Sequence, residues 1–259
     1  MLDLDAYLRR IGYDGPRKPT PETLAELHLA HATHIPFENL DSHLGRPVHI
    51  DLESIQAKLV RSRRGGYCFE QNTLLAAVLE NLGFRVTTLA ARVRLGASRL
   101  LAKTHMLLMV DLDGGPWLAD VGFGTGGLLL PIPITPERVS RQHGRSYRLM
   151  PEGDTWVLQS LIRGTWQDLY AFTLEPHYPI DFEMANHYVS THPASRFVQT
   201  LVVQRQTIDT CHWLRNREHS VVRGDDVQVR TLKSDEELLQ ALDETFGIEL
   251  PQGSRFPRI

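Results

Sequence analysis

The hydrophobic pattern of the chain changes at Gly83, and this change excludes a fold built from one kind of element. Before Gly83 the apolar residues recur at helical spacing, as Leu74, Leu75, Val78 and Leu79 do. After it they fall into short runs rich in valine, threonine and aromatic side chains, separated by glycine-containing turns. A chain that places its helices first and its strands afterwards is typical of the α+β class.

Three helices are predicted in the first third of the chain. Thr20-Pro21-Glu22 combines a cap residue, a proline at the first helical position and an acid in the first turn, and Pro36 ends that helix. Asp51 can cap a second helix over 52–60, whose apolar residues lie on one side. The third helix begins near Cys68, and Gly83 follows it where a left-handed cap belongs.

The remaining two thirds read mainly as strands, and Arg163-Gly164 marks a turn between two of them. One well-marked helix closes the chain, with Ser234 and Glu237 as a capping box and Gly247 after its last turn. The predicted strands are "FRVTTLAARVR" (84–94), "THMLLMVDL" (104–112), "WLADVGF" (117–123), "YRLM" (147–150), "TWVLQSL" (155–161), "TWQDLYAF" (165–172) and "FVQTLVVQRQ" (197–206).

Composition and charge exclude several classes of protein. A net charge of -3 gives no electrostatic reason to expect nucleic acid or an anionic membrane as partner. Two cysteines in 259 residues argue against a disulfide-built secreted domain. The N-terminus lacks the apolar core of a signal peptide, and no apolar run approaches the length of a membrane span. We therefore expect a soluble, cytoplasmic protein that is a monomer or a weak homo-oligomer.

The segment "RGGYCFEQN" (64–72) places Cys68 at the predicted start of the third helix. The positive end of the helix dipole favours thiolate over thiol at such a position. Gly65 and Gly66 allow a tight turn that leaves the sulfur accessible. These features point to a nucleophile, although free cysteine is also among the residue types most often buried in a core.

His105 begins one predicted strand and Asp120 ends the next, with the turn "DGGP" between them. A turn of two or four residues pairs each odd-numbered residue of one strand with an even-numbered residue of the other. Paired residues lie on the same face of the sheet, so the side chains of His105 and Asp120 would also share a face. A turn of three residues would place them on opposite faces. An imidazole and a carboxylate on one face can activate a cysteine, because the imidazole takes the thiol proton and the carboxylate stabilises the imidazolium. The alternative is two polar residues at strand ends.

Four segments together resemble the signature blocks of the arylamine N-acetyltransferase family: "HIPFENLD" (34–41), "RRGGYCFEQN" (63–72), "KTHMLLMV" (103–110) and "ADVGFG" (119–124). The resemblance implies a helical bundle over residues 1–83, a central β-barrel over 84–185 and an α/β lid over 186–259. It also implies a catalytic core like that of transglutaminases and cysteine proteases.

By this resemblance Cys68 is the nucleophile, His105 the base and Asp120 the orienting carboxylate. It also implies acetyl-CoA as the acyl donor and arylamines, hydrazines or arylhydroxylamines as small-molecule acceptors, without a metal. A cysteine that holds the acetyl group while donor and acceptor exchange gives ping-pong kinetics. The backbone N–H groups of Cys68 and Phe69, at the helix start, are candidate donors to the oxyanion.

The resemblance further implies an acceptor pocket lined by aromatic residues. Ordinary core packing is the alternative for each aromatic residue. The residues implied are Phe37, Val93, Phe123 and Phe197.

The resemblance also pairs Glu38 with Arg64, which we interpret as structural support for the turn before Cys68. A buried pair of this kind is costly to break from one side.

The glycine-rich loop "GFGTGG" (122–127) follows a predicted strand. Its backbone N–H groups, those of Gly124, Thr125 and Gly126, could bind an anion such as a phosphate of CoA. A turn that needs positive φ angles is the alternative. The loop lacks the lysine and hydroxyl residue that end a P-loop.

The segment "HLAHATH" spaces His28, His31 and His34 as on one face of a helix. No carboxylate or cysteine nearby completes a metal site, so we predict none there.

Two other classes of function stay open. A cysteine-triad amide synthase, amidohydrolase or transglutaminase-like enzyme shares these residues but acts on amides. A non-catalytic binding module shares the fold alone. Fast alkylation of Cys68 near neutral pH, compared with Cys211, distinguishes an enzyme from a binding module.

Overall fold

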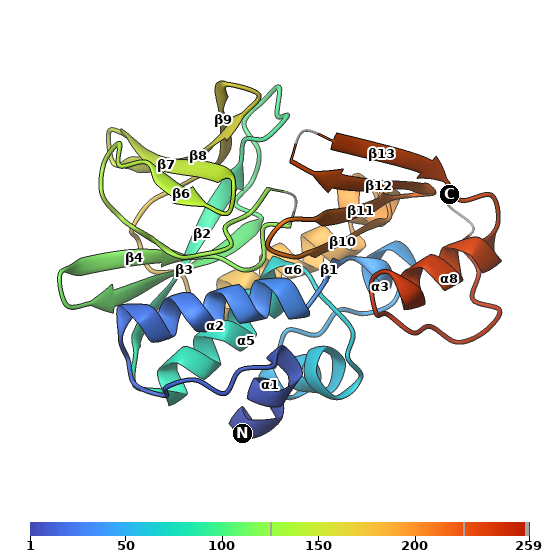
Figure 1. Ribbon diagram of the computed structural model, residues 1–259, viewed down its shortest axis with the longest axis horizontal. Helices are drawn as coiled ribbons and strands as arrows, with labels where there is room; N and C mark the ends of the chain where they lie inside the picture. Colours follow the sequence, from blue (N-terminus) through green and yellow to red (C-terminus); the bar gives the residue numbers. More distant parts are fainter. Residues whose placement is uncertain (125, 225, 257–258) are drawn as a thin grey trace.

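The helices gather in the N-terminal third and return near the C-terminus, as Figure 1 shows for this computed structural model. The structure describes residues 1–124, 126–224, 226–256 and 259. The helical segments are α1 (Leu4–Ile11), α2 (Pro21–His34), α3 (Leu40–His43), α4 (Leu52–Ile55) with its π-helical continuation η1 (Gln56–Arg61), α5 (Cys68–Asn81), α6 (Pro179–Thr191), α7 (Arg196–Gln199) and α8 (Asp235–Glu244).

Eight strands form an antiparallel sheet in the order β5-β4-β3-β2-β9-β8-β7-β6. The chain after β5 bridges back to β7 at Pro136 and Leu149, which brings the two edges together into a nearly closed barrel. Its strands are β2 (Arg85–Val93), β3 (His105–Leu112), β4 (Gly115–Ala119), β5 (Ile132–Pro133), β6 (Ser140–Gln142), β7 (Arg145–Glu152), β8 (Thr155–Ile162) and β9 (Thr165–Phe172).

A second antiparallel sheet, in the order β1-β10-β11-β12-β13, lies to the right of the barrel in Figure 1. Its first strand comes from the N-terminal part, where Phe37 lies opposite Gln204 and Glu38 opposite Val203. One helix, α8, packs its buried leucines Leu238 and Leu242 on this sheet. The strands are β1 (Phe37–Glu38), β10 (Val202–Gln206), β11 (Cys211–Arg215), β12 (Glu218–Arg223) and β13 (Asp226–Thr231).

The start and end signals predicted for α2 and α5 are confirmed. Thr20 accepts a hydrogen bond from the Thr23 N–H and so caps α2, and α5 begins at Cys68. Gly83 adopts a φ of 88°, the left-handed conformation that the end of α5 requires. In the second helix the regular α-turns stop at Ile55, and the rest of the predicted segment is the π-helical η1.

Two local predictions are wrong in detail. The predicted strand 197–206 is helical in its first part, because the Ser195 hydroxyl caps α7 by accepting the Phe197 N–H. Ser234 caps α8 as expected, because its hydroxyl accepts the Glu237 N–H. The Glu237 carboxylate accepts from the Lys233 N–H and not from the Ser234 N–H, so the predicted capping box is not formed.

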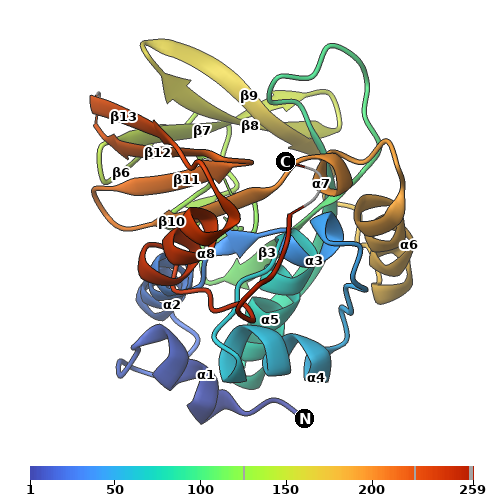
Figure 2. The same cartoon turned by 90° about the vertical axis from the view of Figure 1, so that its right-hand side faces the viewer.

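The sequence analysis predicted no helix at α1, α6 or α7. In Figure 2 α6 stands at the right-hand edge of the molecule, beside α7. Only part of its surface is buried, through Phe182, Asn186, Val189 and Ser190. Its exposed face carries apolar residues as well, which hides the helical period in the sequence.

Three clusters of buried apolar residues lie in the helical part with the adjoining strands, inside the barrel, and between α8 and the second sheet. The expected boundary between residues 185 and 186 falls inside α6, and β1 joins the sheet of the C-terminal part. The division into three domains stays a prediction.

A buried charge cluster holds the turn before α5. Arg64 Nε lies 2.9 Å from Glu38 Oε1, the pair expected from the family resemblance. Lys58 Nζ lies 2.7 Å from Glu70 Oε1 and 2.8 Å from Asp41 Oδ2. All five side chains are shielded from water, so Glu38 and Asp41 depend on both cations for their stability, and Glu70 depends on Lys58.

We expect Lys58→Met to lower the free energy of unfolding by about 3–5 kcal/mol, because it leaves three buried carboxylates with one cation. Urea denaturation measures this change. Arg61→Met is the matched control, since Arg61 pairs with Glu53 in solvent and such a pair contributes about 1 kcal/mol or less. Equal losses in the two variants would contradict the role given to the cluster.

Candidate active site

Cys68, His105 and Asp120 come together where α5 meets the barrel. Cys68 is the first residue of α5, His105 the first of β3, and Asp120 directly follows β4. Leu112 pairs with Gly115, which leaves a turn of two residues and puts His105 and Asp120 on one face. His105 Nε2 lies 2.7 Å from Asp120 Oδ2. The same-face arrangement predicted for a two-residue turn is therefore confirmed.

The Cys68 thiol contacts the same imidazole. Because Nε2 of His105 is bound to Asp120, Nδ1 is the ring nitrogen left for Cys68. The sulfur lies 3.7 Å from the carbonyl oxygen of Thr104, the residue before His105. Exposed fractions of 4% for Cys68, 3% for His105 and 1% for Asp120 show that water is largely excluded.

The surroundings favour a protonated imidazole. Burial acts against the charge of His105, but the Asp120 carboxylate and the contact with Cys68 outweigh it and raise the pKa of His105 to about 10. Burial also acts against the Asp120 anion, yet the imidazole and two further donors hold the pKa of Asp120 below its ordinary value. The site therefore stabilises the imidazolium that forms when His105 takes the thiol proton.

Asn72, on α5, forms hydrogen bonds with β3 and with the segment that carries Asp120. The sequence analysis did not single it out. Its amide nitrogen donates to Asp120 Oδ1 at 2.9 Å and to the Met106 carbonyl at 2.7 Å. Its oxygen accepts the Val121 N–H at 3.1 Å. The spacing of four residues from Cys68, on one face of α5, was the only signal in the sequence.

Gly122 allows the loop after β4 to approach α5. A Cβ at this position would lie 2.6 Å from the Cys68 Cα and 2.8 Å from Asn72 Nδ2. The Gly122 N–H also donates to Asp120 Oδ1 at 2.9 Å. Gly65 permits a second close approach, since a Cβ there would lie 2.1 Å from the Pro36 carbonyl oxygen.

The start of α5 offers free backbone donors. Among the described residues, none accepts a hydrogen bond from the N–H of Cys68 or Phe69. The Glu70 carboxylate accepts the Tyr67 N–H at 3.1 Å, which orders the turn just before them. Two adjacent N–H groups at a helix start can stabilise a negative oxygen beside the sulfur.

Aromatic rings lie beside His105 and in the neighbouring core, and they include three of the residues predicted for the acceptor pocket. The ring of Phe123 lies 5.3 Å from that of His105, and Phe37 lies 5.9 Å from Phe197. Tyr170, which the sequence analysis missed, lies 4.8 Å from the His105 ring. Phe123 and Tyr170, which also pack on each other at 5.1 Å, therefore cover one part of the imidazole with apolar surface.

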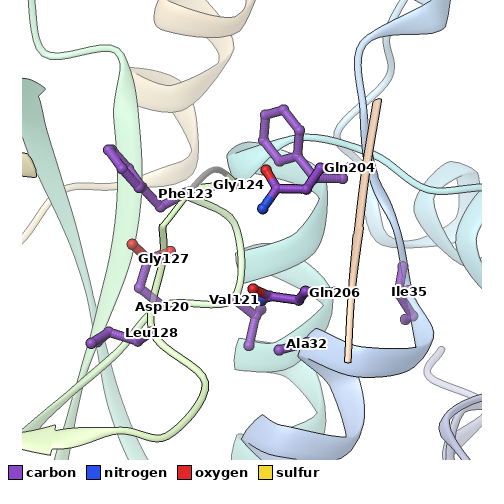
Figure 3. A pocket seen from close by; sticks show the side chains of 11 residues that line it. Ala32, Ile35, Asp120, Val121, Phe123, Gly124, Gly127, Leu128, Gln204 and Gln206 are labelled. Carbon is purple, nitrogen blue, oxygen red and sulfur yellow. The ribbon is translucent and has the colours of Figure 1, made fainter. Parts of the chain in front are cut away.

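The predicted pocket residues do not line one cavity. Phe37, Phe123 and Gly124 line a small cavity of about 10 Å³ beside Asp120, which Figure 3 shows. Val93 lines a different groove of about 550 Å³, between the end of β2, the segment that follows it, and β8 and β9. This groove carries four cationic side chains that the sequence analysis did not connect with a site: Arg92, Arg94, Arg99 and Lys103.

The glycine-rich loop turns through positive φ angles at Gly124 (79°) and Gly126 (73°). Gly124 packs against Phe37, whose ring atoms would lie 3.2 Å from a Cβ at this position. Gly126 has open space around it. Thr125 lies outside the described residues.

Within residues 1–124, 126–224, 226–256 and 259, no three or more histidine, cysteine or acidic side chains are grouped as metal ligands. No helix in those segments has the length and apolar character needed to cross a membrane.

Known proteins resemble this chain over most of its length. A family model described as N-acetyltransferase matches residues 20–255. A curated arylamine N-acetyltransferase of Mycolicibacterium smegmatis is 44% identical, and the match covers 96% of this chain and 93% of that protein. An arylamine N-acetyltransferase / N-hydroxyarylamine O-acetyltransferase of Salmonella typhimurium is 38% identical over 95% of this chain and 88% of that protein.

Solved structures share the fold. Mycobacterium marinum arylamine N-acetyltransferase in complex with CoA has a TM-score of 0.92 to this chain at 37% identity. The match covers 99% of this chain and 96% of that one. The predicted α+β fold, with N-terminal helices, a barrel and a C-terminal sheet and helix, is confirmed.

We expect Gly122→Ala to slow iodoacetamide labelling of Cys68 on the order of a hundredfold, because the added methyl group pushes the Asp120 loop away from α5. Gly126→Ala is the control, since it strains the same loop without meeting another atom. Peptide mass spectrometry over time measures both rates. Similar rates in the two variants would mean that the close approach at Gly122 does not order the site.

The raised pKa of His105 predicts a pH-dependent stability. The folded protein holds a proton on His105 up to a pH of about 10, whereas an unfolded histidine loses it near its ordinary pKa of 6.5. In Cys68→Ala no thiol can supply this proton, so it must come from solvent, and the free energy of unfolding of this variant should fall as pH rises above 6.5, by up to about 1.4 kcal/mol per pH unit.

Cys68→Ala combined with His105→Gln should lack this part of the decline, and the difference between the unfolding curves of the two variants isolates it from other groups that titrate. Parallel curves for the two proteins across this range would contradict the raised pKa.

Proposed function

Since the chain belongs to the arylamine N-acetyltransferase family, we propose that it transfers the acetyl group of acetyl-CoA to the nitrogen of an arylamine or hydrazine. Cys68 is the nucleophile, His105 the general base and acid, and Asp120 the carboxylate that orients the imidazole. The observation that carries this proposal is the buried His105–Asp120 hydrogen bond of 2.7 Å beside a cysteine at a helix start.

The first half of the reaction moves the acetyl group onto the protein. His105 takes the proton of Cys68, and the thiolate attacks the thioester carbonyl of acetyl-CoA. The carbonyl oxygen becomes negative and accepts hydrogen bonds from the N–H groups of Cys68 and Phe69. The C–S bond to CoA then breaks, and the departing CoA sulfur takes the proton from His105.

The second half begins when CoA has left and the amine enters. The amine nitrogen attacks the carbonyl carbon of acetyl-Cys68, and His105 removes one amine proton. Collapse of the adduct breaks the bond to sulfur, and Cys68 regains its proton from His105. Burial of the site slows hydrolysis of the acetyl-cysteine, because water has little access to its carbonyl.

The acceptor ring binds beside Phe37, Phe123 and Phe197 when these rings move apart, because the cavity that Phe37 and Phe123 line holds only about 10 Å³. Val93 lines a separate groove. Apolar rings around His105 suit an aromatic amine, and their packing supports this assignment. An arylhydroxylamine is a second acceptor, reacting through its oxygen, and the printed name of the Salmonella typhimurium relative supports it.

CoA binds where backbone donors and cations lie near the triad. Gly124 and Gly126 turn through positive φ angles in a loop that suits an anion. The cations Arg99 and Lys103 of the larger groove can attract the phosphates of CoA. A relative with the same fold was solved in complex with CoA, which supports CoA as the carrier.

Intact-protein mass spectrometry after mixing with acetyl-CoA tests this function. We expect a gain of one acetyl group, its absence in Cys68→Ala, and its loss from the wild-type protein when an arylamine is added. Cys211→Ala is the matched control and should keep the adduct, because burial raises the pKa of that thiol. No adduct on the wild-type protein, or one that persists in Cys68→Ala, would overturn the proposal.

A further inference from the structure

Two fully buried histidines on α2 have no part in the reaction described above. His28 and His31, from the segment "HLAHATH", have exposed fractions of 0%. They lie about one helical turn apart and face the barrel and α5 rather than solvent. Each ring forms hydrogen bonds through both of its nitrogens, so both histidines connect α2 to other parts of the structure.

The bonds of His28 permit one protonation state. Nδ1 lies 2.9 Å from the Leu129 carbonyl oxygen, which can only accept, so Nδ1 carries the proton. Nε2 lies 3.1 Å from the backbone nitrogen of Asp120, which can only donate, so Nε2 is unprotonated. The neutral imidazole is therefore the form that satisfies both neighbours.

His28 thereby joins the two ends of the loop that carries Asp120. Asp120 and Leu129 begin and end this segment, and both bond to the same ring. Figure 3 shows Val121 and Leu128 of the segment in the cavity that Ala32 of α2 also lines. The position of the Asp120 backbone thus depends on a side chain of α2, 92 residues earlier in the chain.

His31 reaches the nucleophile from the same helix. Gln71 donates from Nε2 to the carbonyl oxygens of Pro36 (3.0 Å) and Gly66 (3.2 Å), so its oxygen accepts from His31 Nε2 at 2.7 Å. His31 Nδ1 accepts from the Tyr7 hydroxyl at 2.8 Å. This series of bonds ends at Gly66, two residues before Cys68.

We propose that His28 is a positioning residue for the triad of Cys68, His105 and Asp120. As a neutral imidazole it holds the Asp120 backbone in the position from which the Asp120 carboxylate forms its hydrogen bond with His105. His31 holds the Cys68 turn through Gln71, so α2 is the common frame for nucleophile and carboxylate. The inference rests on the proposed function, which assigns Asp120 and Cys68 their roles.

The electrostatic surroundings agree with neutral rings. Burial lowers the pKa of His28 to about 4, although Asp120 and the two backbone bonds act in the other direction. Burial lowers the pKa of His31 to about 3, opposed by the bond to Gln71 and assisted by His28 and Arg10. Both rings are neutral across the pH range in which Cys68 is alkylated.

Two substitutions separate the two bonds of His28. In His28→Gln the side-chain amide reaches the place of Nε2 and can still accept the Asp120 N–H. In His28→Asn it reaches only the place of Nδ1, so the Asp120 N–H loses its partner. His34→Gln is the control, since His34 lies exposed at the end of the same helix.

The measurement is the rate of iodoacetamide labelling of Cys68 as a function of pH. In His28→Asn we expect a rate about 10- to 100-fold lower near pH 7 and a midpoint shifted to higher pH, because a displaced Asp120 stabilises the imidazolium less. His28→Gln and His34→Gln should keep the wild-type midpoint. Unfolding curves recorded in parallel separate a change at the site from a general loss of stability.

Equal midpoint shifts in His28→Gln and His28→Asn, or a lower rate in His28→Asn with an unshifted midpoint, would overturn the inference. The labelling needs no acetyl-CoA. If the wild-type protein forms no acetyl adduct but the midpoint shifts as expected, the proposed function fails and the positioning role of His28 stands.

A second measurement does not depend on the folding of His28→Asn. Nitrogen NMR of the histidine-labelled wild-type protein should show a ring protonated at Nδ1 and not at Nε2 between pH 5 and 8. The signal is assigned to His28 by its absence in His28→Gln. A proton on Nε2 would overturn the inference, because the ring could not then accept from Asp120.

Discussion

The hydrogen bond between His105 Nε2 and Asp120 Oδ2 is the contact on which the rest of the site depends. A buried carboxylate is stable as an anion only where donors surround it. Each donor to Asp120 comes from a different place: the imidazole from β3, the Asn72 amide from α5, and the Gly122 N–H from the loop itself. The helical part and the barrel therefore meet around one negative charge, and this brings the cysteine of α5 next to the imidazole of β3.

Charged groups hold one part of the site and neutral polar groups hold the other. The turn before Cys68 is held by charged groups, which include Lys58, Arg64 and Asp41, and by Glu70, whose pKa burial raises to about 7. The Asp120 loop is held by neutral groups, the imidazole of His28 and the amide of Asn72. Neutral donors and acceptors fix the position of a carboxylate without changing the charge balance that raises the pKa of His105. A cation in place of His28 would compete with the imidazolium for Asp120.

Much of the fold and the triad could be predicted from the sequence, because the signals involved are local. Cys68 at a helix start follows from the helical period and the glycine pair before it, and the shared face of His105 and Asp120 follows from the length of one hairpin turn. Predictions failed where local signals were weak. The exposed face of α6 is also apolar, so its sequence lacks a clear period, and α7 is too short to show one.

The sequence by itself determined where α2 and α5 begin, the change from helices to strands after Gly83, the family through four motifs, and the length of the turn that puts His105 and Asp120 on one face of the sheet. Only the tertiary structure decided which polar residues hold the triad in place. His28 bonds to a residue 92 positions away, and Asn72 to one 48 positions away. No local pattern encodes such pairs, because a hydrogen bond between distant residues depends on where whole elements pack. The groups that position the catalytic carboxylate therefore became visible only when α2, α5 and the barrel were seen together.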